Sequence, residues 1–219
     1  MNAAYEFVTG PLAWAAWGIF LLGSAYRLYS MYQLAKKKDG PFLTYMDWGF
    51  SLRSIINWLI PFNALGWRKN PLLTVTTYAF HICLLAVPVF LVAHVALWTE
   101  FFGVSYATLP DSVADAMTLV VLAACLVFAG RRLTQKEVAY ITTGKDWLAL
   151  AIVALPFLTG FLAYHQMFDY QVMIVAHIVA GEIMLAAIPF TRLSHMVFAA
   201  FTRAYIGSEF GGVRHARDW

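Results

Sequence analysis

Four of the six histidines lie inside long apolar segments of the sequence. His81 and His94 share one segment, and His177 and His195 share another. Ionisable side chains inside membrane-type segments are rare and usually serve a function. A single such histidine is more often a satisfied core residue, but four on two segments favour a common role. Because imidazole is the commonest metal ligand in proteins, the first candidate chemistry is metal coordination.

The segments that carry these histidines belong to a chain built mainly of apolar residues. Of the 219 residues, 61% are hydrophobic and 12% are charged, and the mean hydropathy is +0.67. A soluble domain is usually about half apolar and a quarter charged. Five stretches are long enough to span a bilayer as helices, and they cover about residues 11–33, 73–98, 113–130, 147–164 and 172–201. We therefore expect an all-α integral membrane protein, a five-transmembrane-helix bundle that forms one domain over residues 1–219.

The basic residues predict the orientation of these spans. All fifteen lysines and arginines fall in alternate connections or at the matching ends of the spans, and the 99–112 and 165–171 loops contain none. The positive-inside rule then places the N-terminus outside and the C-terminus in the cytoplasm. The formal net charge of +3 is too weakly basic to indicate nucleic acid as a partner.

This orientation pairs the four histidines by depth. The second span runs outward and the fifth runs back, so His81 and His195 lie at inner depth, and His94 and His177 at outer depth. Eighteen residues are five full turns, which puts His177 and His195 on one face of a fifth helix that we expect to be kinked at Pro189. Thirteen residues leave His81 and His94 about 140° out of phase on an ideal helix.

Pro88, between His81 and His94, is the residue expected to unwind or kink the second helix and change that phase. Two imidazoles from facing helices, one on each side of a flat macrocycle, are how a helical bundle holds a low-spin haem. Zinc would need a fuller tetrahedral ligand set. A covalent c-type haem would need a Cys-x-x-Cys-His motif, which the sequence lacks. The sequence therefore predicts two b-type haems and electron transfer.

The pattern resembles the membrane cytochrome b family of the respiratory nitrate reductase gamma subunit and its relatives in the redox complexes of sulfate-reducing bacteria. The resemblance rests on the five spans, the histidine pairs, the Trp-Leu-Ile-Pro-Phe-Asn stretch at 58–63 and the Trp-Arg-Lys-Asn-Pro turn at 67–71. It implies that His81 and His195 hold the inner haem iron, and His94 and His177 the outer one. It further implies a cytoplasmic iron–sulfur subunit as partner. In the sulfate-reducer complexes with a high-molecular-weight or tetrahaem cytochrome c, that multihaem cytochrome is periplasmic.

Five other polar residues are candidates near these sites. Glu182 in the fifth span could relay protons to a quinone such as menaquinone, or be a protonated, hydrogen-bonded structural glutamate. His165, at the outer end of the fourth span, could accept a proton from quinol, or be an exposed loop histidine. Arg192 and Arg131 could each pair with a haem propionate, as could the neighbouring Arg132, or be ordinary residues of basic loops.

Residues 47–60 have the profile of a helix lying in the membrane interface, either as an anchor or as a shelf for a cytoplasmic partner. The chain carries no flavin, nucleotide or iron–sulfur motif, so it would be an electron-transfer subunit that is not catalytic alone. Two rival functions remain open. One is a haem-free membrane anchor or proton-handling transporter subunit, and the other is a haem-containing quinol oxidase subunit.

Overall fold

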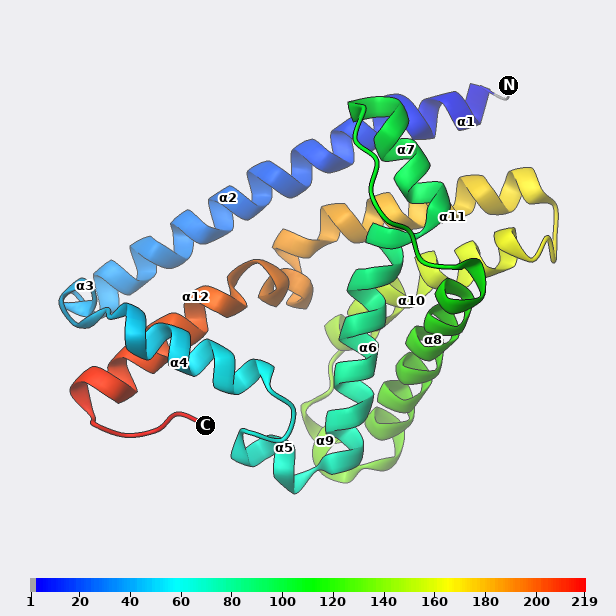
Figure 1. Cartoon of the computed structure of the whole chain (residues 1–219). Helices are drawn as coiled ribbons and strands as arrows, with labels where there is room; N and C mark the ends of the chain where they lie inside the picture. Colours follow the sequence, from blue (N-terminus) through cyan, green and yellow to red (C-terminus); the bar gives the residue numbers. More distant parts are fainter. Residues whose placement is uncertain (1–2) are drawn as a thin grey trace. The chain divides into compact units, whose positions relative to one another are not determined.

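The computed structural model describes residues 3–219, and every regular element in that range is a helix (Figure 1). Five helices are long and apolar enough to cross a membrane, as the sequence predicts. They are Ala3–Lys38, Pro71–Phe90, Asp111–Thr134, Gly144–Tyr164 and Tyr170–Phe190. The prediction of an all-helical, multi-pass membrane protein is therefore confirmed, while the sidedness of the termini stays a prediction.

The chain divides into two compact units. The first contains residues 3–8 and Val75–Gly181, and the second contains Thr9–Thr74 and Glu182–Trp219. Each unit is built from segments that are distant in the sequence. The single domain expected over residues 1–219 stays a prediction.

The first unit contains α1 (Ala3–Phe7), most of α6 (Pro71–Phe90), α7 (Val92–Phe102), α8 (Asp111–Thr134), α9 (Lys136–Ile141), α10 (Gly144–Tyr164) and most of α11 (Tyr170–Ala187). Helices α8 and α10 pack along one another. The N-terminus of α10 is fixed by a capping box between Thr143 and Asp146. The same Asp146, which is buried, also lies 3.9 Å from the Arg132 guanidinium of α8.

The segment predicted as one helix over 73–98 is divided into α6 and α7. Leu91, between the two helices, has an extended backbone with φ −66° and ψ 134°. The interruption lies three residues after Pro88, the residue expected to distort this helix. Since the chain leaves the helical conformation between His81 and His94, the 140° phase difference of an ideal helix does not apply to them.

The second unit contains α2 (Ala13–Lys38), α3 (Phe42–Tyr45), α4 (Trp48–Leu59), α5 (Leu65–Lys69) and α12 (His195–Ser208). Asp39, directly after α2, accepts hydrogen bonds from the hydroxyls of Tyr205 on α12, at 2.6 Å, and of Tyr45 on α3. These two bonds hold the pKa of the Asp39 carboxyl below its ordinary value. Burial, together with the bond to Asp39, raises the pKa of Tyr45.

Helix α4 lies within the segment predicted as an interfacial helix over 47–60, and it packs along α12 (Figure 1). Its contact face is hydroxylic: Ser51 Oγ lies 3.0 Å from Ser208 Oγ of α12, and Ser54 Oγ donates to Asp218 at 2.5 Å. All three serines are buried, whereas Trp48 is 83% exposed and Leu59 is 68% exposed. Small polar residues inside and large apolar residues outside are typical of helix pairs in lipid.

The segment predicted as one kinked helix over 172–201 is not continuous. Helix α11 ends at Ala187, two short 3₁₀ turns follow at Ile188–Phe190 and Arg192–Ser194, and α12 begins at His195. Pro189 has no N–H group to donate to the preceding turn and its ring crowds that turn, which explains why the helix stops here. The prediction of one helix over 172–201 is therefore wrong, and the count of five helical turns between His177 and His195 does not apply.

Candidate functional site

The structure brings together His94 of α7 and His177 of α11, the pair that the sequence analysis assigns to the outer site. The two imidazole rings have centroids 5.9 Å apart and planes only 12° from parallel. Both residues belong to the first unit. Two nearly parallel imidazoles from different helices therefore form the centre of the candidate site.

A backbone carbonyl fixes the tautomer of each ring. His94 Nδ1 lies 2.8 Å from the oxygen of Pro88, and His177 Nδ1 lies 2.8 Å from the oxygen of Pro156 on α10. A carbonyl oxygen can only accept, so each Nδ1 is the protonated donor of its neutral ring. Each Nε2 then carries a lone pair. This is how proteins usually orient a histidine that binds a metal through Nε2.

The lone pairs also argue against a simple hydrogen bond between the two rings. Neutral His94 and His177, each with its proton on Nδ1, have no proton on Nε2 to donate to one another. The spacing of 5.9 Å lies in the range of ordinary aromatic pairs. It is also close to the spacing of a site in which two Nε2 atoms face one metal ion, because two bonds of about 2 Å plus half a ring on either side would give roughly 6 Å between ring centres.

Gly160 of α10 provides the space that the His177 ring occupies. A Cβ atom at this glycine would lie 2.9 Å from both Cε1 and Nδ1 of His177. Real Cβ contacts are practically never that short, so a side chain at residue 160 would displace the ring. Gly160 is therefore part of the site, although it carries no chemistry of its own.

The side chains present suit haem better than a metal ion held by protein ligands alone. Within residues 3–219, no three His, Cys, Asp or Glu side chains gather in a group that could hold a metal ion. A protein-bound zinc ion needs three or four such ligands. A b-type haem needs only two axial imidazoles, because its four equatorial ligands come from the porphyrin. The pair His94 and His177 meets this requirement.

The inner pair is divided between the two units: His81 belongs to the first and His195 to the second. Each ring nevertheless makes the same kind of hydrogen bond as the rings of the outer pair. His81 Nδ1 lies 2.8 Å from the Thr77 oxygen, and His195 Nδ1 lies 2.8 Å from the Arg192 oxygen. All four histidines thus make an Nδ1 bond to a backbone carbonyl. The pairing of His81 with His195 stays a prediction.

Glu182 lies on α11, five residues after His177. Both of its carboxyl oxygens are buried, and among residues 3–219 no hydrogen-bond partner reaches either oxygen. A buried carboxyl group without a partner is costly, and such groups in membrane helices often handle protons or bind ligands. The structure gives no support to the alternative of a hydrogen-bonded structural glutamate.

The two arginines predicted near haem propionates have roles within their own elements. Arg131 Nε donates to the side chain of Gln135 at 3.2 Å, one turn further along the chain. Arg192 begins the second 3₁₀ turn, and its backbone oxygen is the acceptor for His195. Contact of either guanidinium with a propionate stays a prediction.

His165 is exposed directly after α10, which agrees with the alternative of an exposed loop histidine. It also has a specific partner. Its Nε2 lies 2.9 Å from a carboxylate oxygen of Asp115 on α8. The Phe161 ring packs against the imidazole with centroids 4.3 Å apart. An imidazole next to a carboxylate is an arrangement that can accept a proton.

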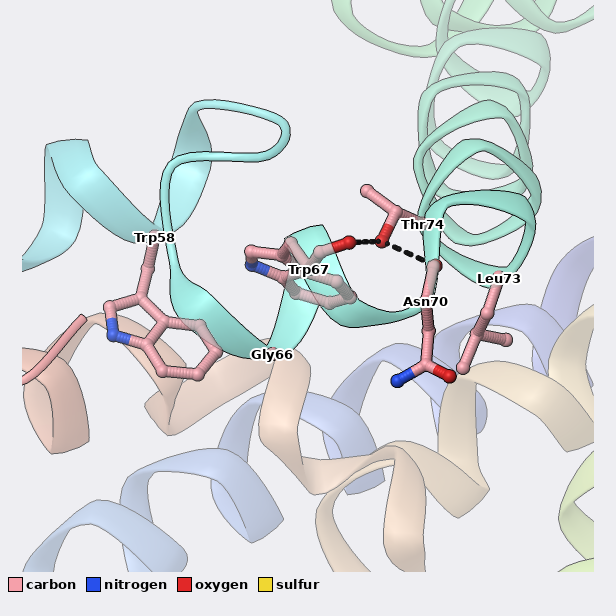
Figure 2. A pocket seen from close by; sticks show the side chains of 6 residues that line it. All are labelled: Trp58, Gly66, Trp67, Asn70, Leu73 and Thr74. Atoms are coloured by element: carbon pink, nitrogen blue, oxygen red, sulfur yellow. Dashed lines mark hydrogen bonds between the residues drawn. The ribbon is translucent and has the colours of Figure 1, made fainter.

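A separate open pocket lies in the second unit, between the end of α4 and the start of α6 (Figure 2). Trp58 and Trp67 face each other edge to face there, with ring centroids 5.9 Å apart. The other lining residues are Gly66, Asn70, Leu73 and Thr74. The pocket thus joins the 58–63 and 67–71 stretches on which the family resemblance rests, and none of the predicted site residues lines it.

Sequence reasoning missed three residues of the first unit that contact the candidate site residues: Pro156, Gly160 and Asp115. Each acts on a residue that is 17 or more positions away in the chain. Helical periodicity reports only neighbours within a turn or two, so it carries no signal for these contacts. Of these residues, Pro156 and Gly160 lie inside one apolar span, where a proline followed by a glycine is an irregularity that the sequence does show.

The helices and the paired imidazoles define a multi-pass helical membrane protein with a two-histidine site. A protein of Nitratidesulfovibrio vulgaris (strain Hildenborough) is 37% identical over 211 residues, which cover 94% of this chain and 93% of that protein. The chain belongs to the same family as this relative, whose name is simply "Protein" and states no activity. No family model and no solved structure matches the chain.

Proposed function

We propose that the chain is the di-haem cytochrome b subunit of a membrane redox complex in a bacterial inner membrane. The observation that carries this proposal is the pair His94 and His177, with nearly parallel rings and both Nδ1 atoms committed to backbone carbonyls. In the proposal, His94 and His177 hold the outer haem b, and His81 and His195 hold the inner one. Haem supplies one-electron chemistry, and two axial imidazoles leave no position for a substrate.

Electrons would pass across the membrane between a periplasmic multihaem cytochrome c, or the quinone pool, and a cytoplasmic iron–sulfur subunit. The chain's part is to hold and orient the haems. The Pro88 and Pro156 carbonyls keep each Nε2 available, and Gly160 gives the His177 ring its place. The C-terminus would be cytoplasmic and the N-terminus outside, because the basic residues lie in alternate connections.

The test is a haem count on the purified full-length chain, by pyridine haemochrome and reduced-minus-oxidised spectra. We expect two haems b. Substitution of either His94 or His177 by alanine should remove one haem, and substitution of either His81 or His195 should remove the other. His215→Ala, in the C-terminal tail, is the matched control and should retain both.

A chain without a Soret band would contradict the proposal. It would favour the rival function of a haem-free membrane anchor or proton-handling transporter subunit. In that case the buried Glu182 would become the first residue to test for proton movement, because it is an unpartnered carboxyl group in a membrane helix.

The hydrogen bond between His165 and Asp115 favours a second candidate function, oxidation of a quinol such as menaquinol beside the outer haem. His165 and the outer pair belong to the same unit, and His165 follows Gly160 on α10 by five residues, about 7.5 Å along the axis. A base at this position could accept the quinol proton. His165→Gln should slow quinol-dependent haem reduction while dithionite still reduces both haems, and His215→Gln should leave both reactions unchanged.

A further inference from the structure

Three consecutive backbone carbonyls are released where α6 ends, and each finds a different partner. In a continuous helix the oxygens of Pro88, Val89 and Phe90 would accept from the N–H groups four residues later. The extended backbone at Leu91 prevents this. Instead they accept from His94 Nδ1 at 2.8 Å, from the Tyr106 hydroxyl at 2.9 Å and from the Leu109 N–H group at 2.8 Å, respectively.

The loop that follows α7 supplies two of these three donors. Helix α7 ends at Phe102 and is capped by Gly103, whose φ of 67° lies in the left-handed region that favours glycine. The chain then runs back to the helix interruption, where Tyr106 makes two contacts. Its hydroxyl binds Val89, and its ring packs edge to face on Phe90 with centroids 6.1 Å apart. The loop therefore supplies hydrogen-bond donors to two carbonyls that the helix interruption leaves without helical partners.

The helix interruption determines which partner the Pro88 oxygen has and therefore how His94 is held. A continuous helix would restore the 140° phase difference between His81 and His94, and the Pro88 oxygen would pair with Val92 instead of His94. Only the interrupted helix presents that oxygen to the imidazole. The bond from Tyr106 to Val89 is exposed on the protein surface, but Val89 lies near the end of a candidate membrane span, Pro71–Phe90. Leaving Val89 without its Tyr106 partner would weaken the interrupted form, because a backbone carbonyl that faces lipid without a hydrogen bond is costly.

We propose that Tyr106 is a positioning residue for the outer site, acting through the Val89 carbonyl and the helix interruption to hold His94 on the Pro88 oxygen. This inference rests on the proposed function and deepens it, since it names what regulates the donor strength of one haem ligand. A hydrogen bond at Nδ1 makes an imidazole a stronger donor to the metal. Loosening that bond should therefore raise the reduction potential of the outer haem.

The test compares Tyr106→Phe with the wild type in the full-length protein. Phenylalanine retains the ring on Phe90 and removes only the hydroxyl. Tyr140→Phe is the matched control, because Tyr140 on α9 is 92% exposed. We expect Tyr106→Phe to retain both haems. The midpoint potential of the outer haem should shift upward and the low-spin EPR signal of the same haem should shift as well. The potential and the signal of the second haem should stay unchanged. The control should match the wild type in all three readouts.

Hydrogen–deuterium exchange gives a second readout that does not depend on haem. Amides of residues 89–95 should exchange faster in Tyr106→Phe than in the wild type or in Tyr140→Phe. Unchanged exchange together with unchanged potentials would overturn the positioning role. A wild-type chain without haem would overturn the proposed function, and faster exchange in Tyr106→Phe would then still support Tyr106 as the residue that holds the interruption open.

Discussion

His177 Nδ1 on α11 lies 2.8 Å from the backbone oxygen of Pro156 on α10, and Gly160 lies one turn further along α10 against the same ring. The imidazole is thus held by a carbonyl and accommodated by a glycine of a neighbouring helix. This relationship makes α10 part of the histidine site although it contributes no ligand.

Gly160→Ala should remove the outer haem, or weaken its binding, and lower stability. The added Cβ would lie 2.9 Å from the His177 ring, and overpacking of this kind typically costs about 1–3 kcal/mol. Haem count and thermal unfolding in detergent measure both effects. Gly181→Ala on α11 is the control, because open space surrounds the position that an added Cβ would take there. Equal behaviour of the two variants would contradict this account.

Gly23→Ala should destabilise the second unit. Its Cβ would lie 2.7 Å from Pro189 Cγ and 2.8 Å from Phe190, where α2 packs against the first 3₁₀ turn after α11. We expect a loss of about 1–3 kcal/mol, seen as a lower thermal midpoint. Gly18→Ala, on the same helix with open space around it, should instead be neutral or stabilise by up to about 1 kcal/mol.

Asp39 should make stability depend on pH at the acid end. Its pKa is lowered in the folded chain by the hydrogen bonds from Tyr205 and Tyr45, relative to an ordinary value of 3.8. The stabilisation is present above that ordinary value and is lost as the pH falls through the lowered pKa. Asp39→Asn should therefore flatten the acid side of a curve of unfolding temperature against pH. Glu137→Gln, at an exposed carboxyl on α9, should reproduce the wild-type curve.

Ser208→Ala should loosen the pairing of α4 with α12. The Ser208 hydroxyl lies 3.1 Å from the Asp47 N–H group and 3.0 Å from the Ser51 hydroxyl, and the side chain is fully buried. Loss of these bonds leaves buried partners unsatisfied, at a cost of about 1–3 kcal/mol. Ser112→Ala, at an exposed serine on α8, should stay within about 0.5 kcal/mol of the wild type. Limited proteolysis between α3 and α4 would report the loosening directly.

Hydropathy predicts the helical class and the five spans well, because membrane helices require long apolar runs. Depth counting also pairs His94 with His177 before any contact is known. The prediction is wrong after Ala187, where Pro189 ends the helix and does not merely kink it. Such an outcome depends on how the released backbone groups are satisfied, and Thr191, for example, caps the next turn with its own side chain. Spacing in the sequence does not report this.

The serine face of α4 has a consequence for how the protein is made. Ser51 and Ser208 bond across 157 positions of sequence, so α4 is synthesised long before its partner α12 exists. Until then its outer surface of Trp48, Leu52, Ile56 and Leu59 suits hydrocarbon, while its hydroxyls have no helix to bind. We therefore expect the serine face of α4 to stay without its helical partner until α12 has been made. A chain that stops before residue 195 would lack α12, and the serine face of α4 would then have no helix to bind.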